Sequence, residues 1–470
     1  MPKEKAKKNP SILLSGGRST SGKTVTTIGI MAALKKRGYD VQGFKVGLDY
    51  IDPSYHKFIT GNPSYNLDGY LMEEESIKKQ FIEKSQNSDI SIIEGVRGLY
   101  EGININTDIG STYQISQILD LPIILIIDAR SITKTAAAIV KGIKNLKKPD
   151  IIGVIFNKTG SKRHEEKLEK SVEKYTDIKV LGTIPRDERL DIEMRHLGLV
   201  PAKEMDSLKK IQEKIKDIRR VMEENLDIKH LVKIARRYKS SIKNKKISEQ
   251  IHKDSRNKKQ EKNFENKKIA LAYDKAFNFY YQANIDLLEN LGAKIEKFSP
   301  IKDKNIPSGT DGIYIGGGYP ELFLNELEDN ESMKQSIYDF YQSNKPIYGE
   351  CGGLMYLMNS INYRDRESNM VGVFNGKAAV GDKYRVVGYT NGGIIRDNIL
   401  GKKGIRFRGH EFHHSKIKKL EESNFAFKLD RGRGIKQNLD GLIKKNVLAC
   451  YTHLHFLSHE NFPKKFVKNL

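Results

Sequence analysis

The sequence predicts an α/β protein of at least two domains, and three observations lead to this fold class. Short runs of isoleucine, leucine and valine alternate with helical segments in the first part of the chain, a pattern typical of parallel sheets covered on both faces. A glycine-rich loop follows the first run, and a lone cysteine between glycines follows a later one. At 470 residues the chain also exceeds the usual size of one domain.

The first domain is expected to span residues 1–235 and to contain a parallel sheet. Its strand signals lie at residues 11–15, 41–45, 90–94, 122–128, 151–157 and 180–185. Residues 23–37 show helical periodicity directly after the glycine-rich loop. The charged stretch 202–238 is expected to be helical and to close this domain.

A charged linker is expected at residues 236–266. Residues 236–268 hold 13 Lys or Arg against 4 Asp or Glu, with few apolar side chains, as in solvated linkers. We therefore do not interpret the net charge of +23 as a sign of nucleic-acid binding, since a basic surface also suits a small polyanion. The second domain, residues 267–470, begins with strand signals at 268–273, 312–316 and 346–349 and becomes more alternating from about Val371.

Composition favours a cytoplasmic protein that needs no membrane. No run of 18 apolar residues occurs, and no signal-peptide pattern precedes the first strand signal. The two cysteines, Cys351 and Cys450, are too few for a disulfide framework, and a reducing compartment keeps a catalytic thiol usable. The oligomeric state is left open, with a homodimer as one alternative.

A phosphate-binding loop is predicted where Gly17 to Thr24 match G-x-x-x-x-G-K-[ST] between a strand and a helix. Backbone N–H groups of such a loop, here at Gly17, Ser21 and Gly22, surround the phosphates of ATP. Lys23 is expected to reach the outer phosphates, and the Thr24 hydroxyl to bind Mg²⁺.

Carboxylates for the magnesium ion are expected at the ends of buried strands. Glu94 ends one such strand, and Asp49 follows another; a turn role is the alternative for Asp49, as for the nearby Asp52. Lys45 is a candidate to hold a phosphate or an acyl phosphate. Asn157 lies at a strand's carboxyl end, where it is expected to contact the nucleotide base or, alternatively, to cap a backbone group.

A catalytic thiol is predicted at Cys351. An apolar run leads into Gly-Glu-Cys-Gly-Gly, which indicates a strand ending in a sharp elbow that exposes the thiol near backbone N–H groups. Those groups are expected to lower the thiol pKa and to bind an oxyanion. Residues 449–455 place His453 and His455 at the end of another strand, and either histidine can serve as the base.

Together the two motifs suggest an amide-forming enzyme. ATP would activate a carboxylate as an acyl phosphate, and the thiol would hydrolyse glutamine to release ammonia. Ammonia is mostly protonated at neutral pH, so its local release favours attack on the activated carboxylate.

The motifs resemble those of the tetrapyrrole a,c-diamide synthases, which comprise cobyrinate and nickel-sirohydrochlorin a,c-diamide synthases. The resemblance covers nearly the whole chain outside the linker and rests on segments 44–53, 66–68, 94–102, 110–112, 195–199, 316–321, 350–353 and 409–413. It implies a dethiobiotin synthetase-like P-loop domain and a class I-type glutaminase domain. The implied substrates are ATP, L-glutamine or ammonia, and a polycarboxylate tetrapyrrole.

The resemblance also assigns roles to individual residues. Thr24, Asp49 and Glu94 would surround Mg²⁺, and Lys45 would face the phosphates. Cys351 would be the glutaminase nucleophile and His453 its base. The acid that follows the histidine by two residues in class I enzymes is missing, because His455 stands there, so a Cys–His dyad is implied.

The substrate and its contacts are the least determined features. Leu48, Arg97, Glu101 and segment 128–133 depart from the cobyrinate enzymes and favour nickel-sirohydrochlorin, which precedes the nickel coenzyme of methanogens. Candidates to hold the acceptor carboxylates, each with a loop-packing alternative, are Asp52, His56, Asn66, Asp68 and Arg97.

Two other functions remain as alternatives. One is another glutamine-dependent amidotransferase, such as a cobyric acid synthase. The other is a P-loop ATPase with a degenerate binding module, which would have no use for an activated thiol. A metal site at His410, His413 and His414 is a weaker alternative within the second domain.

Overall fold

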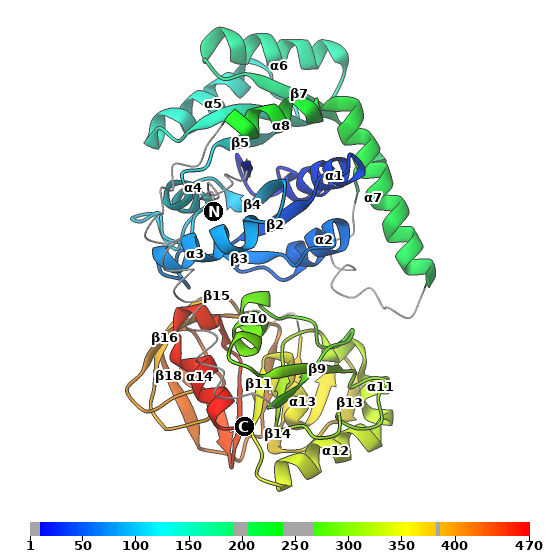
Figure 1. Cartoon of the computed structure of the whole chain (residues 1–470), viewed down its shortest axis with the longest axis vertical. Coiled ribbons are helices and arrows are strands. Elements are labelled where there is room, and N and C mark those ends of the chain that lie inside the picture. Colours follow the sequence, from blue (N-terminus) through cyan, green and yellow to red (C-terminus); the bar gives the residue numbers. More distant parts are fainter. Residues whose placement is uncertain (1–9, 192–204, 238–266, 382–385) are drawn as a thin grey trace, which may run out of the picture. The chain divides into compact units, whose positions relative to one another are not determined.

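The computed structural model describes residues 10–191, 205–237, 267–381 and 386–470 (Figure 1). They form two compact units, the N-terminal unit up to residue 237 and the C-terminal unit from residue 267. Most of the predicted linker, and the whole motif at residues 195–199, lie outside the described residues.

The N-terminal unit contains a seven-stranded parallel sheet in the order β3-β2-β4-β1-β5-β6-β7. Burial on both faces explains its continuous apolar strands. All six strand signals of the sequence are confirmed, and the short β3 is an additional strand. The strands are β1 Ser11–Gly16, β2 Val41–Val46, β3 Tyr65–Leu67, β4 Ile90–Gly98, β5 Ile123–Asp128, β6 Ile151–Thr159 and β7 Val180–Pro185.

Helices cover both faces of this sheet. One apolar cluster joins α1, α2, α7 and α8 to one face, while α5 and α6 share a second cluster on the other. The described part of the predicted helical stretch 202–238, residues 205–237, forms two helices, α7 and α8, separated at Leu226 and Asp227. The helices are α1 Lys23–Lys36, α2 Ile51–Thr60, α3 Glu74–Ser85, α4 Thr112–Leu119, α5 Lys134–Lys147, α6 Lys162–Tyr175, α7 Met205–Asn225 and α8 Ile228–Arg237.

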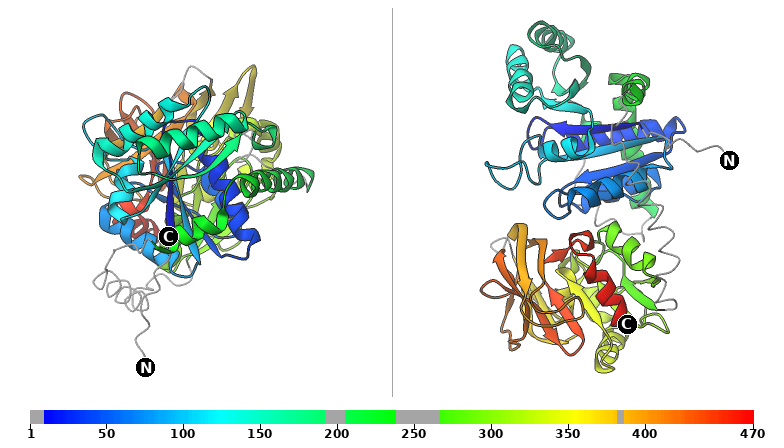
Figure 2. Two further views of the ribbon diagram at one scale, coloured as in Figure 1. Left: turned by 90° about the horizontal axis from the view of Figure 1, so that it is seen from above. Right: turned by 60° about the vertical axis from the view of Figure 1, so that its left-hand side comes forward.

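The C-terminal unit contains a ten-stranded mixed sheet in the order β21-β16-β15-β18-β19-β20-β11-β10-β8-β9. Strands β20, β11, β10, β8 and β9 are parallel, and the remaining pairs are antiparallel, as the change of pattern in the sequence predicts. Figure 2 shows the orange strands gathered on one side of this unit and the green ones on the other. The strands are β8 Lys268–Ala272, β9 Lys294–Phe298, β10 Gly312–Ile315, β11 Ile347–Glu350, β15 Val386–Ile394, β16 Arg406–His413, β18 Phe425–Arg431, β19 Leu439–Lys444, β20 Val447–Cys450 and β21 His453–Leu454.

A second, four-stranded sheet and several helices complete the C-terminal unit. This sheet has the order β13-β12-β14-β17, formed by β12 Met358–Tyr363, β13 Arg366–Asn369, β14 Phe374–Val380 and β17 Ser415–Lys418. The helices are α10 Gln282–Asn290, α11 Leu324–Asp329, α12 Glu331–Gln342, α13 Gly352–Leu357 and α14 Asn461–Lys468. The predicted α/β class is confirmed. Within the described ranges, every helix is too short or too polar to cross a bilayer.

Candidate functional site

The predicted phosphate loop lies between β1 and α1. Gly22 has a φ of 92° directly before α1, and a Cβ there would lie 1.9 Å from the Asn157 side-chain nitrogen, so a glycine is required. The Gly17 N–H donates to the Ile126 carbonyl at 2.9 Å, which fixes the start of the loop. The hydroxyl of the buried Ser21 has no hydrogen-bond partner among the described residues, and a phosphate oxygen would satisfy it.

Asn157 supports this loop from the end of β6. Its Nδ2 donates to the Ser21 carbonyl at 2.9 Å, and its Oδ1 accepts from the Lys158 N–H at 2.9 Å. Both polar atoms of the Asn157 amide are therefore hydrogen-bonded to backbone groups. The geometry favours the structural alternative for Asn157, while a base contact stays a prediction.

Lys23 points back to the end of β4 in this structure. Its Nζ donates to the backbone carbonyl of Arg97, and burial together with the nearby charge of Lys45 lowers the pKa of Lys23 to about 8. A bound phosphate would give the ammonium group the counter-charge that a carbonyl oxygen only partly supplies.

Lys45 lies buried at the carboxyl edge of the sheet between two acids and the loop threonine. Its Nζ contacts Asp52 and lies 2.9 Å from Glu94 Oε1. The Thr24 hydroxyl donates to Glu94 Oε1 at 2.6 Å and lies 3.3 Å from Asp52 Oδ2. One hydroxyl and two carboxylates thus converge, a set of oxygen donors that fits Mg²⁺.

Burial and charge act against each other in this cluster. Burial alone lowers the pKa of Lys45, but Asp52 and Glu94 outweigh it and raise that pKa. Burial alone also raises the pKa of Glu94, yet Lys45 and His56 outweigh it and lower that pKa. Burial, with Asp49 and Glu94 nearby, raises the pKa of Asp52 well above its usual range. The single positive charge of Lys45 therefore only partly balances the two carboxylates of Asp52 and Glu94.

The structure places Asp52, rather than Asp49, beside Thr24 and Glu94. Asp49 Oδ1 accepts the N–H groups of Ile51 at 2.8 Å and Asp52 at 3.0 Å, which is the turn role considered as its alternative. Its other oxygen lies 4.0 Å from Lys45 Nζ. Sequence reasoning did not select Asp52 as a metal ligand, because only the start of α2 at Ile51 directs Asp52 toward the strand end.

This difference leads to a first prediction about magnesium use. Asp52→Asn is expected to raise the Mg²⁺ concentration needed for ATP-dependent amidation by roughly tenfold or more, since it removes a ligand charge. Asp49→Asn, which can still cap α2, is the matched control with an expected change within about twofold. Magnesium titration of both variants checks this, and a larger effect at Asp49 would contradict the arrangement.

Most of the acceptor-site candidates serve the fold here. His56 is fully buried and contacts Glu94 Oε2 at 2.9 Å and the Ser64 hydroxyl at 3.2 Å. Asn66 donates to the carbonyls of Gly47 and Asp49, and Asp68 accepts the N–H groups of residues 70 and 71. Arg97, by contrast, is exposed at the end of β4 and remains a candidate to bind an acceptor carboxylate.

In the C-terminal unit the elbow at Cys351 has the predicted form. Cys351 lies between β11 and α13 with φ 50° and ψ −96°, a strained conformation typical of nucleophile elbows. The Cys351 N–H donates to the Cys450 carbonyl at 2.7 Å. A Cβ on Gly353 would lie 2.2 Å from the Ile315 carbonyl oxygen, so the close approach of α13 to β10 requires that glycine.

The predictions of an exposed thiol and a lowered thiol pKa are wrong for this structure. Cys351 is 4% exposed, and its Sγ lies 3.6 Å from the Phe412 carbonyl oxygen. Burial, followed by the charge of Glu321, raises the thiol pKa, and the Gly352 N–H only partly opposes them. The proton therefore rests on sulfur, and catalysis requires a base.

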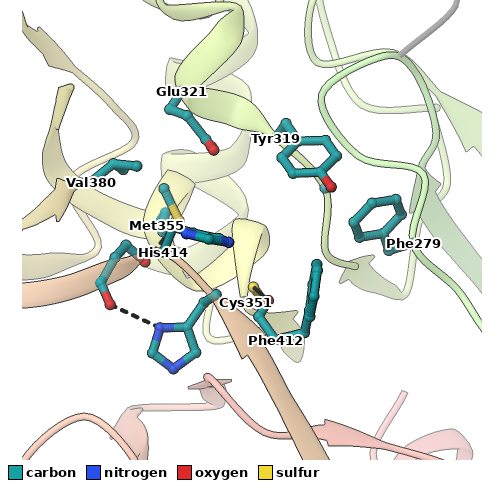
Figure 3. Close-up of a pocket in the computed structure, with 11 residues that line it drawn as sticks. Phe279, Tyr319, Glu321, Cys351, Met355, Val380, Phe412 and His414 are labelled. Atoms are coloured by element: carbon teal, nitrogen blue, oxygen red, sulfur yellow. Dashed lines mark hydrogen bonds between the residues drawn. The ribbon is translucent and has the colours of Figure 1, made fainter. Parts of the chain in front are cut away.

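A small pocket lies beside Cys351 (Figure 3). Tyr319 and Glu321 come from the segment after β10, Phe412 comes from the end of β16, and His414 directly follows that strand. Burial raises the pKa of Glu321 to about 7. Sequence reasoning did not select Glu321, although it ends the family motif 316–321.

His453 lies on β21 and is 1% exposed. Its ring stacks on His410 at 4.8 Å, and burial lowers its pKa to about 3. A Cβ on Gly317 would lie 2.6 Å from His453 Cε1, and one on Gly352 would lie 3.1 Å from the Gly318 nitrogen. The His453 ring thus borders the same glycine loop that packs against the elbow.

His455 has different surroundings. Its ring lies 4.5 Å from that of Tyr281, and neither ring nitrogen has a hydrogen-bond partner among the described residues. The Asn284 side chain donates to the Leu454 carbonyl and accepts from the Phe456 N–H, the backbone groups on either side of His455. The choice of His453 over His455 as the base stays a prediction, supported by the contact of the His453 ring with the glycine loop at Gly317.

His413 lines the pocket but has structural contacts of its own. Its Nδ1 lies 2.8 Å from the Ser415 carbonyl oxygen, and its ring stacks on Tyr451 at 3.8 Å. Its Nε2 lies 4.0 Å from Glu411. Among the described residues, no group of three or more His, Cys, Asp or Glu side chains is placed to hold a metal ion, so the alternative of a metal site near His410 and His414 gains no support.

Two family models match the chain, one in each unit. Residues 12–200 match the CobQ/CobB/MinD/ParA nucleotide binding domain, and residues 268–461 match the CobB/CobQ-like glutamine amidotransferase domain. The first match includes the phosphate loop, and the second includes both Cys351 and His453.

Similar proteins from several archaea match nearly the full chain. A cobyrinate a,c-diamide synthase of Methanosarcina barkeri is 45% identical, with 99% of this chain and 97% of the relative covered. That of Methanosarcina acetivorans is 46% identical, covering 98% and 95%. That of Methanocaldococcus jannaschii is also 46% identical, covering 97% and 98%.

Proposed function

Since the chain belongs to the cobyrinate a,c-diamide synthase family, we propose that it amidates the a and c acetate carboxylates of a modified tetrapyrrole with ATP and glutamine. The observation that carries this proposal is the pairing, in one chain, of two features: a phosphate loop whose Thr24 lies against Asp52 and Glu94, and a thiol elbow that packs on the same glycine loop as His453.

The N-terminal unit would activate the carboxylate. The loop N–H groups and Lys23 would hold the phosphates of ATP. Thr24, Asp52 and Glu94 would hold Mg²⁺, which would neutralise charge on the transferring phosphate. A carboxylate oxygen of the substrate attacks the γ-phosphorus and ADP leaves, giving an acyl phosphate. Ammonia then attacks the acyl carbon, and inorganic phosphate leaves.

Lys45 would exchange partners during this step. In the structure its ammonium group lies between Asp52 and Glu94, where it balances their charge. A divalent cation bound to the same carboxylates would take over that balance. Lys45 would then be available to hold the phosphate or the acyl phosphate, as the resemblance implies.

The C-terminal unit would release ammonia from glutamine. His453 takes the thiol proton of Cys351, and the thiolate attacks the carboxamide carbon, with the Gly352 N–H as a donor to the oxyanion. The C–N bond breaks as His453 returns the proton to the leaving nitrogen, so ammonia departs. Water then hydrolyses the thioester, which yields glutamate and the free thiol.

Two macrocycles are the proposed acceptors. The names of the relatives support cobyrinate, whereas segment 128–133 favours nickel-sirohydrochlorin. Both carry the a and c acetate groups, so neither half-reaction distinguishes them.

A competition experiment tests the function and ranks the substrates. The purified chain is incubated with Mg-ATP and glutamine and with cobyrinate and nickel-sirohydrochlorin, separately and mixed, and products are followed by mass spectrometry. We expect diamides of at least one macrocycle, and the mixed reaction shows which is preferred. If ATP and glutamine are hydrolysed but neither macrocycle is amidated, both proposed acceptors are wrong, while the two proposed half-reactions still hold.

A further inference from the structure

We propose that Glu350 is the carboxylate that positions His453 during glutamine hydrolysis, an inference that rests on the proposed glutaminase function. The acid would then come from the strand that leads into the nucleophile, instead of from the position two residues after the histidine. That position holds His455, whose neutral imidazole cannot supply the negative charge that an imidazolium needs.

The first support is the placement of the Glu350 carboxylate against β21. Glu350 is the last residue of β11, is 2% exposed and directly precedes Cys351. Its Oε2 lies 3.8 Å from His453 Nδ1, and its Oε1 accepts the Leu454 N–H at 3.0 Å. One carboxylate thus faces the ring of His453 and holds the backbone of the next residue.

The second support is that the carboxylate is fixed from the other side. The hydroxyl of Tyr314 donates to Oε2 at 2.9 Å, and that of Tyr348 donates to Oε1 at 2.6 Å. With Leu454, three donors therefore hold the Glu350 carboxylate in place beside the His453 ring. Catalytic hydrogen bonds are often longer before substrate binds.

The third support is electrostatic. Burial raises the pKa of Glu350 to about 7, and burial lowers the pKa of His453 to about 3. Each charge is therefore costly alone, whereas an imidazolium beside a carboxylate offsets both costs. When His453 takes the proton from Cys351, Glu350 would stabilise the resulting ion and hold Nδ1–H, which leaves Nε2 for the thiol.

A second histidine–carboxylate pair near the pocket provides a matched control. Glu411 lies 4.0 Å from His413 Nε2, but its carboxylate also accepts the N–H groups of Arg433 and Gly434. His413 Nδ1 contacts the Ser415 carbonyl. Glu411 and His413 thus bind backbone groups near β16, and Glu411 does not line the pocket beside Cys351.

The test measures glutamine hydrolysis in Glu350→Gln, since the amide oxygen can still accept from Leu454 and Tyr348 while the amide NH2 can donate to the Tyr314 hydroxyl oxygen. We expect its kcat to fall at least about tenfold, its KM for glutamine to stay within about twofold, and ammonia-dependent amidation to be unchanged. Glu411→Gln is expected to keep kcat within about twofold. An unchanged kcat in Glu350→Gln would overturn the inference.

A double-mutant cycle separates positioning from a merely structural role. If Glu350 acts through His453, adding Glu350→Gln to His453→Asn causes no further loss of kcat. Losses that multiply would overturn the inference. Should Glu350→Gln fail to fold, Glu350→Asp replaces it in both measurements. Its shorter side chain moves the carboxylate away from His453, so we again expect a fall in kcat and no further loss when it is combined with His453→Asn.

The assay also distinguishes this inference from the proposed function. A wild-type chain that hydrolyses no glutamine, or a Cys351→Ser variant that still does, would remove the proposed function and the inference with it. A wild-type chain that hydrolyses glutamine, together with an active Glu350→Gln, would remove only the inference.

Discussion

Cys351→Ser is expected to lose glutamine-dependent amidation by about a thousandfold or more while keeping amidation driven by added ammonia. The serine hydroxyl has nearly the size of the thiol but is a far weaker nucleophile at the same base. The burial that already raises the thiol pKa would oppose an alkoxide still more strongly. Rates with glutamine and with ammonium chloride, measured on the same preparation, check this.

The second cysteine supplies the control. Cys450 is also fully buried, and its Sγ lies 3.1 Å from the Thr452 carbonyl oxygen, so a serine there can donate the same hydrogen bond. Cys450→Ser is expected to retain both activities within a few-fold. Unchanged glutamine use in Cys351→Ser would remove that thiol from the mechanism, and loss with both nitrogen donors would indicate damage beyond the glutaminase step.

Lys45→Met is expected to abolish amidation with either nitrogen donor and to destabilise the N-terminal unit by about 3–5 kcal/mol. The substitution leaves Asp52 and Glu94 buried without the cation that now contacts both. Glutamine hydrolysis by Cys351 is expected to continue, because the substitution lies in the other unit. Urea unfolding and the two half-reaction assays check these expectations.

The stability of Lys45→Met should also depend on pH and on magnesium. The pKa of Asp52 is already raised above its ordinary value, and loss of Lys45 raises it further. A group with a raised pKa in the folded state binds its proton more tightly there, so stability is retained at low pH and falls as the pH rises through that pKa. Mg²⁺ would restore part of the loss by replacing the missing cation.

An exposed ion pair in the same unit serves as the control for this substitution. Lys144 on α5 contacts Asp177, whose side chain is 77% exposed. Lys144→Met is expected to change stability by less than about 1 kcal/mol and to show no magnesium rescue. Equal effects of Lys45→Met and Lys144→Met would contradict the role of Lys45 between the two acids.

Features coded by local sequence could be predicted well. The isoleucine-rich runs became the strands of the N-terminal sheet because each is buried on both faces. The glycines around Lys23 and Cys351 marked two sharp turns because their backbones require close approach or unusual φ values. The strand residues and the turn glycines are both recognised from neighbouring positions in the sequence, by apolar runs in one case and by motif spacing in the other.

Features that depend on distant segments could not be predicted. The thiol of Cys351 is covered by Phe412 and approached by Glu321, which come from separate parts of the chain. Every residue of β11 is buried, so no alternation singled out Glu350, and its partner Leu454 lies about a hundred residues on. Whether Asp49 or Asp52 faces Thr24 depended on where α2 begins.

The central claim is that this one chain transfers nitrogen from glutamine to a tetrapyrrole carboxylate at the expense of ATP. Glutamine labelled with ¹⁵N only at its side-chain amide tests it most directly, with cobyrinate or nickel-sirohydrochlorin as acceptor and mass spectrometry of the product. The account predicts a macrocycle carrying two labelled amides when Mg-ATP is present and none when ATP is omitted. Amidation that appears without ATP, or a product that takes up no label, would contradict it.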